Sequence, residues 1–208
     1  MGGDALMVIG LTGKSCRGKN YVGQILESIG LEVWDTDKMC HDGLNDNIRA
    51  IVSEFGENVI QCTGGRPEVS RPALGKIVFE DPAKRKALED ILYPWLGKRV
   101  SQWMNHNPDG KLVLNGALLY RSGLCELCSC VIYVDASYET RLGRAIERDN
   151  LDEKAFKLRE MAQQDVDFRD VTYPVTLYIV SNNDSNLDEV NRQILDICDK
   201  LDVVYPKA

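Results

Sequence analysis

A glycine-rich segment at residues 10–20 most constrains the fold of this chain, because it joins an apolar run to a helical pattern. Gly13, Gly18 and Lys19 have the spacing G-x-x-x-x-G-K of a phosphate-binding loop. Glycines let backbone N–H groups curl around phosphate oxygens, the next helix offers its positive end, and the lysine reaches the β- and γ-phosphates. The segment predicts a nucleotide-binding strand–loop–helix unit, although a chance glycine turn after a buried strand has the same spacing.

The last position of this loop is unusual. It normally holds Ser or Thr, whose hydroxyl ligates Mg²⁺, and here it is Asn20. An amide oxygen can also ligate a hard cation, so we expect nucleotide binding while the metal geometry stays open. The residues expected to bind the nucleotide are Gly13, Ser15, Cys16, Arg17, Gly18, Lys19, Asn20 and Tyr21, with Asn20 also a candidate ligand for Mg²⁺.

Composition narrows the classes of protein that fit. The chain has 208 residues and a net charge of −7, which favours one domain and argues against a broad nucleic-acid-binding surface. No apolar run approaches the length of a membrane span, and the seven cysteines come without a secretory signal pattern. We therefore expect a cytoplasmic protein with reduced thiols and a small-molecule substrate, as a monomer or small homo-oligomer, without membrane or nucleic-acid partners.

Strand and helix patterns alternate along the chain, which is typical of βαβ units and a parallel sheet. Pro94 is expected to kink or break the long central helix, and residues 64–67 are the clearest loop. The stretch between the second and third strands is too long for a simple crossover and predicts a helical, substrate-binding insertion. Strands are expected at 6–9, 32–34, 112–114, 131–134 and 177–180, and helices at 21–29, 47–55, 82–105, 136–148, 153–164 and 187–201.

Two carboxylates follow the second predicted strand. Asp35 and Asp37 are two residues apart, so in extended chain both side chains face one side. The carboxyl ends of parallel strands are where such folds place ligands, and a carboxylate there can accept a hydroxyl proton or hold Mg²⁺. Alternatively, one of them only caps a helix beginning near Lys38. Position alone does not decide between these two interpretations.

Three arginines, Arg141, Arg144 and Arg148, lie on one face of a predicted helix, with Arg159 and Arg169 further along. Such a cationic face fits a lid that closes over a triphosphate. A solvated face, with nearby acidic residues offsetting the charge, is the alternative.

A cysteine cluster, Cys125, Cys128 and Cys130, has a spacing that zinc sites use. A structural zinc site needs four ligands, and the two histidines, His41 and His106, are far away in sequence. We therefore expect these cysteines to be small buried hydrophobic residues instead.

Motifs along nearly the whole chain, in order and at matching spacing, resemble those of the dephospho-CoA kinase family. Residues 71–79 (RPALGKIVF) and 85–94 (RKALEDILYP) point to this family more specifically than the phosphate loop does. The chain departs from the family at Asn20 for a Ser, Tyr93 for a His, and Asn115 and Arg121 for two acids. The other similar segments are 10–13 with 18–19, 35–38, 55–56, 131–144, 148–149, 158–163 and 179–182.

The resemblance implies a three-layer α/β P-loop kinase with a parallel five-stranded sheet. Its core is expected at 1–37, 108–140 and 170–208, its substrate-binding insertion at about 38–107, and a helical lid at about 141–169. It also implies transfer of the γ-phosphoryl of ATP to the ribose 3′-hydroxyl of dephospho-CoA. The expected catalytic residues are Asp37 as base, Asp35 supporting it or the metal, Lys19 and Arg144; Arg144 and Arg148 would bind ATP, and Asp37, Arg71, Asn115 and Leu118 the acceptor.

Two other functions stay open. A nucleotide or nucleoside kinase would share the loop, core and lid. A catalytically impaired nucleotide-binding regulator is suggested by Asn20 and Asn115, which replace groups expected near the metal.

Overall fold

The computed structural model describes residues 5–161, 163, 166–167, 175–183 and 187–203. The chain divides into two compact units. The first consists of the residues up to Asp35 together with those from Asn107 onward, and the second is Thr36–His106. Each unit is described separately below.

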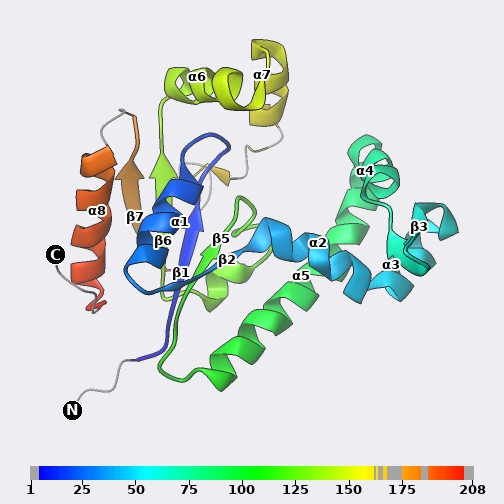
Figure 1. The fold of residues 1–208 in the computed structure, drawn as a ribbon, viewed down its shortest axis with the longest axis horizontal. Coiled ribbons are helices and arrows are strands. Elements are labelled where there is room, and N and C mark those ends of the chain that lie inside the picture. Colours follow the sequence, from blue (N-terminus) through cyan, green and yellow to red (C-terminus); the bar gives the residue numbers. More distant parts are fainter. Residues whose placement is uncertain (1–4, 162, 164–165, 168–174, 184–186, 204–208) are drawn as a thin grey trace. The chain divides into compact units, whose positions relative to one another are not determined.

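The first unit is built on a five-stranded sheet with the order β2-β5-β1-β6-β7 (Figure 1). Every pair of neighbouring strands in it is parallel. The predicted α/β class with a parallel five-stranded sheet is therefore confirmed, and all five predicted strands are present. The strands are β1 (Met7–Thr12), β2 (Glu32–Asp35), β5 (Lys111–Asn115), β6 (Cys130–Asp135) and β7 (Thr176–Ser181).

Helices α1 (Lys19–Ser28) and α8 (Leu187–Lys200) lie side by side against one face of this sheet (Figure 1). Their apolar stripes are buried in a common core with the central strands, which is why both helices are amphipathic. Helices α6 (Tyr138–Asp149) and α7 (Glu153–Met161) follow β6 and form the described part of the expected lid. Gln164, at the end of the predicted helix, and Arg169 lie outside the described residues.

The segment after β5 buries the cysteine cluster, partly in the short 3₁₀ helix η2 (Leu124–Leu127). All seven cysteines are free thiols. Cys128 Sγ lies 3.3 Å from the carbonyl oxygen of Leu124, and burial raises the pKa of its thiol far above the ordinary value. Burial also raises the pKa of Cys130 to about 11. In the part of the chain that the structure describes, no three His, Cys, Asp or Glu side chains are grouped to hold a metal.

The second unit contains helices around a small apolar core and one antiparallel hairpin. Gly64 and Gly65 both have positive φ and form a two-residue hairpin turn. The predicted loop at 64–67 is therefore wrong for Arg66 and Pro67, which belong to a strand. The elements are α2 (Thr36–Asp46), α3 (Ile48–Phe55), η1 (Glu57–Val59), β3 (Ile60–Thr63), β4 (Arg66–Val69), α4 (Arg71–Glu80) and α5 (Pro82–His106).

Pro94 does not break α5, which runs as one helix through this position. Leu92 and Leu96, on either side of the proline, are both buried. Tertiary packing of an apolar face can hold a helix across one missing backbone hydrogen bond, because packing supplies most helical stability. A break at Pro94 is therefore wrong, and a kink there stays a prediction. None of the described helices is both long and apolar enough to cross a membrane.

Candidate active site

The phosphate loop, residues 13–18, joins the carboxyl end of β1 to the first residue of α1. Gly13 has φ +143°, and a Cβ there would lie 2.5 Å from the carbonyl oxygen of Val134. Gly18 has φ +91°, and its Cβ would lie 2.2 Å from Asn182 Nδ2. Both positions therefore require glycine, for conformation and for space.

Within the loop, left-handed residues lie on both sides of Arg17. Cys16 has φ +63° and Gly18 has φ +91°. Backbone that alternates in this way turns successive N–H groups toward one concavity, which binds anions. Lys19 Nζ lies at the same loop and donates a hydrogen bond of 2.7 Å to the carbonyl oxygen of Gly13. The loop thus has the backbone shape and the cation that phosphate binding requires.

The Arg17 side chain is a buried structural group. It is 2% exposed and lies 3.3 Å from Asp135 and 3.7 Å from Asp167. Its guanidinium also hydrogen-bonds to the hydroxyl of Tyr133 and lies 5.0 Å from the centre of that ring. Any contact of Arg17 with ATP is therefore expected from its backbone N–H and not from its side chain.

A second basic residue of the loop, Lys14, ties it to the lid. Its ammonium lies 3.2 Å from Asp167 and 3.9 Å from Glu160 of α7. Glu160 is held in turn by both guanidinium nitrogens of Arg141, a buried residue of α6. Burial alone would raise the pKa of Glu160, but these cations hold it below its ordinary value. Arg141 is therefore a structural member of the predicted arginine face.

Arg144, one turn further along α6, contacts the phosphate loop directly. It donates hydrogen bonds to the carbonyl oxygen of Cys16 at 3.3 Å and to that of Asn182 at 3.0 Å. Burial lowers the pKa of its guanidinium from the ordinary value. Of the three arginines on this face, Arg144 is the one that donates a hydrogen bond to the backbone of the loop, at Cys16.

Arg148 lies at the exposed end of the same face. Its side chain is 64% exposed and forms an ion pair of 2.8 Å with Asp149. Arg159 of α7 contacts the same carboxylate at 2.9 Å. The hydrogen bond from Arg148, together with that from Arg159, lowers the pKa of Asp149 to about 2. Arg148 Nη2 also lies 3.7 Å from Cys16 Sγ, at the rim of the loop.

Two residues that sequence reasoning did not assign to the site contact the backbone of the loop. Gln163 Oε1 accepts a hydrogen bond of 2.8 Å from the N–H of Ser15. Asn182, buried after β7, donates a hydrogen bond of 2.8 Å to the carbonyl oxygen of Arg17. Both lie in segments that resemble the family, and this was the only signal that could have identified them.

The carboxyl ends of β2 and β5 bring polar residues together beside the loop. Asp35 and Asn115 are register partners at the ends of these two strands. Asn115 Nδ2 donates a hydrogen bond of 3.2 Å to Oδ1 of Asn20, the second residue of α1. Carboxylate and amide oxygens are hard donors of the kind that Mg²⁺ prefers. The donor set therefore fits this ion in type, with less negative charge than a site with two carboxylates.

Asp37 does not share the extended strand with Asp35. Strand β2 ends at Asp35 and α2 begins at Thr36, which places Asp37 in the first helical turn. The prediction that both side chains face one side of extended chain is therefore wrong, because helix formation starts between them. A carboxylate in a first turn is favoured by the helix dipole, so its position has a structural explanation as well as a catalytic one.

Two further predicted site residues lie near these groups. Tyr21 is half-buried and packs against the core of the first unit. Leu118 is half-buried in the turn after β5. Both positions are compatible with packing, and their contacts with ligands remain predictions.

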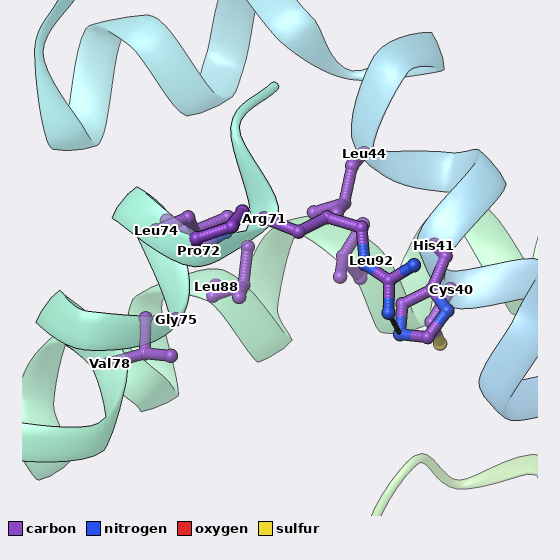
Figure 2. Close-up of a pocket in the computed structure, with 10 residues that line it drawn as sticks. All are labelled: Cys40, His41, Leu44, Arg71, Pro72, Leu74, Gly75, Val78, Leu88 and Leu92. Atoms are coloured by element: carbon purple, nitrogen blue, oxygen red, sulfur yellow. Dashed lines mark hydrogen bonds between the residues drawn. The ribbon is translucent and has the colours of Figure 1, made fainter. Parts of the chain in front are cut away.

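The second unit contains a pocket of about 610 Å³ between α2, α4 and α5. Figure 2 shows the Arg71 side chain reaching from α4 toward His41 of α2, where its Nη2 lies 3.1 Å from His41 Nε2. The rest of the lining is mainly apolar: Cys40, Leu44, Pro72, Leu74, Gly75, Val78, Leu88 and Leu92. Arg71, predicted to bind an anionic part of the acceptor, therefore lines a real cavity.

Two solved structures share this fold over nearly the whole chain. The crystal structure of TT1252 from Thermus thermophilus has a TM-score of 0.77 at 26% identity and covers 95% of this chain and 98% of its own. Dephospho-CoA kinase from Campylobacter jejuni has a TM-score of 0.65 at 23% identity, and the match covers 93% of this chain and 96% of the Campylobacter chain. At this lower identity the likeness supports the fold alone.

Sequence comparison is more specific. Dephospho-CoA kinase of Shouchella clausii is 34% identical over 202 residues, which cover 91% of this chain and 96% of the relative. That of Fusobacterium nucleatum is 28% identical over 203 residues, covering 95% and 100%. A family model described as dephospho-CoA kinase matches residues 7–189. On the phosphate loop, the parallel sheet and this match, the chain belongs to the dephospho-CoA kinase family.

Proposed function

We propose that this protein transfers the γ-phosphoryl group of ATP to the ribose 3′-hydroxyl of dephospho-CoA, giving CoA. The observation that carries the proposal is the phosphate loop with Lys19 at its mouth, in a chain whose family match extends over residues 7–189. The family supplies the acceptor. The loop supplies the chemistry, because backbone N–H groups and a lysine are what phosphoryl transfer uses to stabilise charge.

In this proposal each group of the first unit has a separate task. The backbone N–H groups of the loop bind the phosphates of ATP, except that of Ser15, which donates to Gln163. Lys19 neutralises charge that develops on the transferring group, where most of the barrier reduction arises. Arg144 is half-buried at the loop and adds a second cation there. Gln163 and Asn182 hold the loop through its backbone.

Asp37 is the proposed base that accepts the proton of the acceptor hydroxyl, and Asp35 supports it or the metal. The support for this assignment is position, because Asp35 ends a parallel strand and Asp37 follows it, at the edge where such sheets bind ligands. Mg²⁺ would be held by Asn20 and Asp35, with Asn115 beside them, and when bound it neutralises charge on the phosphates.

The pocket in the second unit is the proposed site for part of the acceptor. Its mainly apolar lining fits the uncharged portion of an extended ligand, and Arg71 offers a bidentate cation for a phosphate group. Arg71 and His41 together form its polar side.

The acceptor is tested by a coupled assay for ADP release with ATP, Mg²⁺ and dephospho-CoA, alongside a panel of nucleosides and nucleoside monophosphates. We expect turnover with dephospho-CoA to exceed that with every other acceptor by at least about 100-fold, since remote binding contacts contribute to the rate. Faster turnover with a nucleotide would assign the alternative kinase activity. ATP binding without turnover of any acceptor would favour a regulator, which the amides at Asn20 and Asn115 make a specific alternative.

We further propose that the protein works in the cytoplasm, as a monomer or small homo-oligomer, without nucleic acid as a partner. Seven free thiols support a reducing compartment, and the net charge of −7 disfavours a polyanionic partner.

A further inference from the structure

The two amides near the expected metal contact each other. Asn20 belongs to α1 and Asn115 to β5, 95 residues later, yet Asn115 Nδ2 lies 3.2 Å from Asn20 Oδ1. In phosphate-loop enzymes these places normally carry a hydroxyl on Mg²⁺ and a strand-end Asp. The two departures are thus one change in chemistry, in which an amide–amide pair replaces a hydroxyl–carboxylate pair.

The two amides have different environments. Asn115 is 7% exposed, whereas Asn20 is exposed. Asn115 is paired in register with Leu11 and Asp35 on the neighbouring strands. Gly23 of α1 also lies close, since a Cβ there would lie 3.6 Å from Asn115 Nδ2. Packing therefore restricts the orientation of Asn115, while Asn20 has room to rotate.

We propose that Asn115 is a positioning residue, which holds the amide of Asn20 so that its oxygen stays available as a neutral ligand for a divalent cation. The proposal rests on the proposed function for the presence of a nucleotide-bound cation. An amide N–H can hold an amide oxygen in place and still leave that oxygen a second lone pair. Partners that orient a metal ligand in this way are part of the site even when they do not touch the metal.

This pairing requires both amides. With aspartate at 115, a carboxylate oxygen would face Asn20 Oδ1, and neither atom carries a proton. The Asn20 amide would then rotate so that Nδ2 faces the carboxylate, and Nδ2 has no lone pair with which to bind a cation there. With serine at 20 and aspartate at 115, the serine hydroxyl donates a hydrogen bond to the carboxylate, and its oxygen keeps a lone pair for the metal. We therefore expect cation binding to need matched residues at the two positions.

The test is a double-mutant cycle read by Mn²⁺ binding to the protein saturated with ADP, followed by electron paramagnetic resonance. Asn20→Ala and Asn115→Ala should each weaken Mn²⁺ binding by about tenfold. The double variant should be no weaker than Asn20→Ala alone, because Asn115 acts through Asn20. Asn105→Ala, at an exposed position of α5, is the matched control and should leave Mn²⁺ affinity unchanged. Adding Asn20→Ser to Asn115→Asp should raise Mn²⁺ affinity.

Additive losses in the cycle would overturn the proposal, since Asn115 would then act independently of Asn20. Unchanged affinity in Asn115→Ala would also overturn it. If that variant does not fold, Asn115→Ser takes its place, with the same two outcomes decisive. Non-additive losses in a protein that does not phosphorylate dephospho-CoA would overturn the acceptor alone. Absence of ADP-dependent Mn²⁺ binding in the unmodified protein would overturn both proposals.

Discussion

The phosphate loop of the first unit and the pocket of the second are built in opposite ways for the ligands proposed to bind there. In the loop the backbone forms the anion site, and side chains such as Arg17 and Lys14 are engaged in ion pairs that hold its shape. In the pocket the side chains form the site, with Arg71 beside a mainly apolar lining. Sequence position alone thus does not distinguish Arg17 and Lys14, which pair with carboxylates, from Lys19, which is proposed to contact phosphate. Changes in the loop should therefore abolish turnover or folding, and changes in the pocket should alter acceptor affinity.

Replacing Lys19 gives the largest expected effect on turnover. Lys19→Ala should lower kcat by about 1000-fold while the protein stays folded, because its charge is needed most in the transition state. Steady-state kinetics and circular dichroism check both parts. Lys98→Ala, an exposed lysine of α5, should behave as the unmodified protein. Near-normal turnover in Lys19→Ala would remove the loop from the active site.

Replacing the two carboxylates at the end of β2 and the start of α2 should have different effects. Asp37→Asn should lower kcat by at least about 100-fold with little change in ATP affinity, because a base acts on the acceptor hydroxyl. Asp35→Asn should be milder if this residue only supports the base or the metal. Single-turnover kinetics with calorimetric ATP binding separates the two effects. The reverse ranking would assign the base to Asp35.

Arg17 should matter for folding more than for ligand contact. Arg17→Met removes one of the two cations beside the buried Asp167, which keeps Lys14 at 3.2 Å, and should lower the free energy of unfolding by about 1–3 kcal/mol. Arg148→Met, at the exposed pair with Asp149, should cost less than about 1 kcal/mol. Urea unfolding of both variants measures the difference. Equal, small losses would show that the ion pairs do not hold the loop.

Replacing Arg71 tests whether the pocket of the second unit binds the acceptor. Arg71→Ala should raise KM for dephospho-CoA by about tenfold, the loss of one charged hydrogen bond, with kcat and KM for ATP nearly unchanged. Arg49→Ala, at an exposed position of α3 in the same unit, is the control. If instead kcat falls and the acceptor KM does not change, Arg71 belongs with the reacting groups and the contrast between the regions fails.

The smallest expected effect is the pH dependence of the Asp149 pair. Hydrogen bonds from Arg148 and Arg159 lower the pKa of Asp149 from 3.8 to about 2. The carboxylate therefore stabilises the fold above pH 3.8, and this contribution is lost as pH falls toward 2. Asp149→Asn should therefore lower Tm at pH 7 and at pH 5 by similar small amounts. The difference from the unmodified protein should shrink below pH 3.8. Thermal scans check this, and a difference that grows on acidification would contradict it.

Some of this molecule follows from local sequence. Strands and the helices around them were predicted because side-chain periodicity reflects which face is buried, and the loop because its glycines have a fixed spacing. The predictions were wrong where tertiary packing or a tight turn outweighed a local sequence signal. Pro94 lies within a helix that is held by burial on both sides, and Gly64 and Gly65 form a tight turn that leaves Arg66 and Pro67 in a strand.

The roles of individual side chains were harder to predict from the sequence. Arg17 and Arg144 are both basic residues in or near the loop, yet one is buried among carboxylates and the other donates to the loop backbone. The hydrogen bond between Ser15 and Gln163 joins residues 148 positions apart. Such pairs have no local periodicity, so spacing along the chain does not reveal them.

Periodicity and motifs along the chain are enough to predict the parallel α/β fold, the phosphate loop and the family. The packed structure was needed to show which cations hold the loop, that Asp37 lies in a first helical turn, and that Asn20 and Asn115 are partners. The physical reason is that hydrogen bonds and ion pairs depend on distances of a few ångströms between side chains. Those distances are set when strands and helices pack, after local structure is already specified.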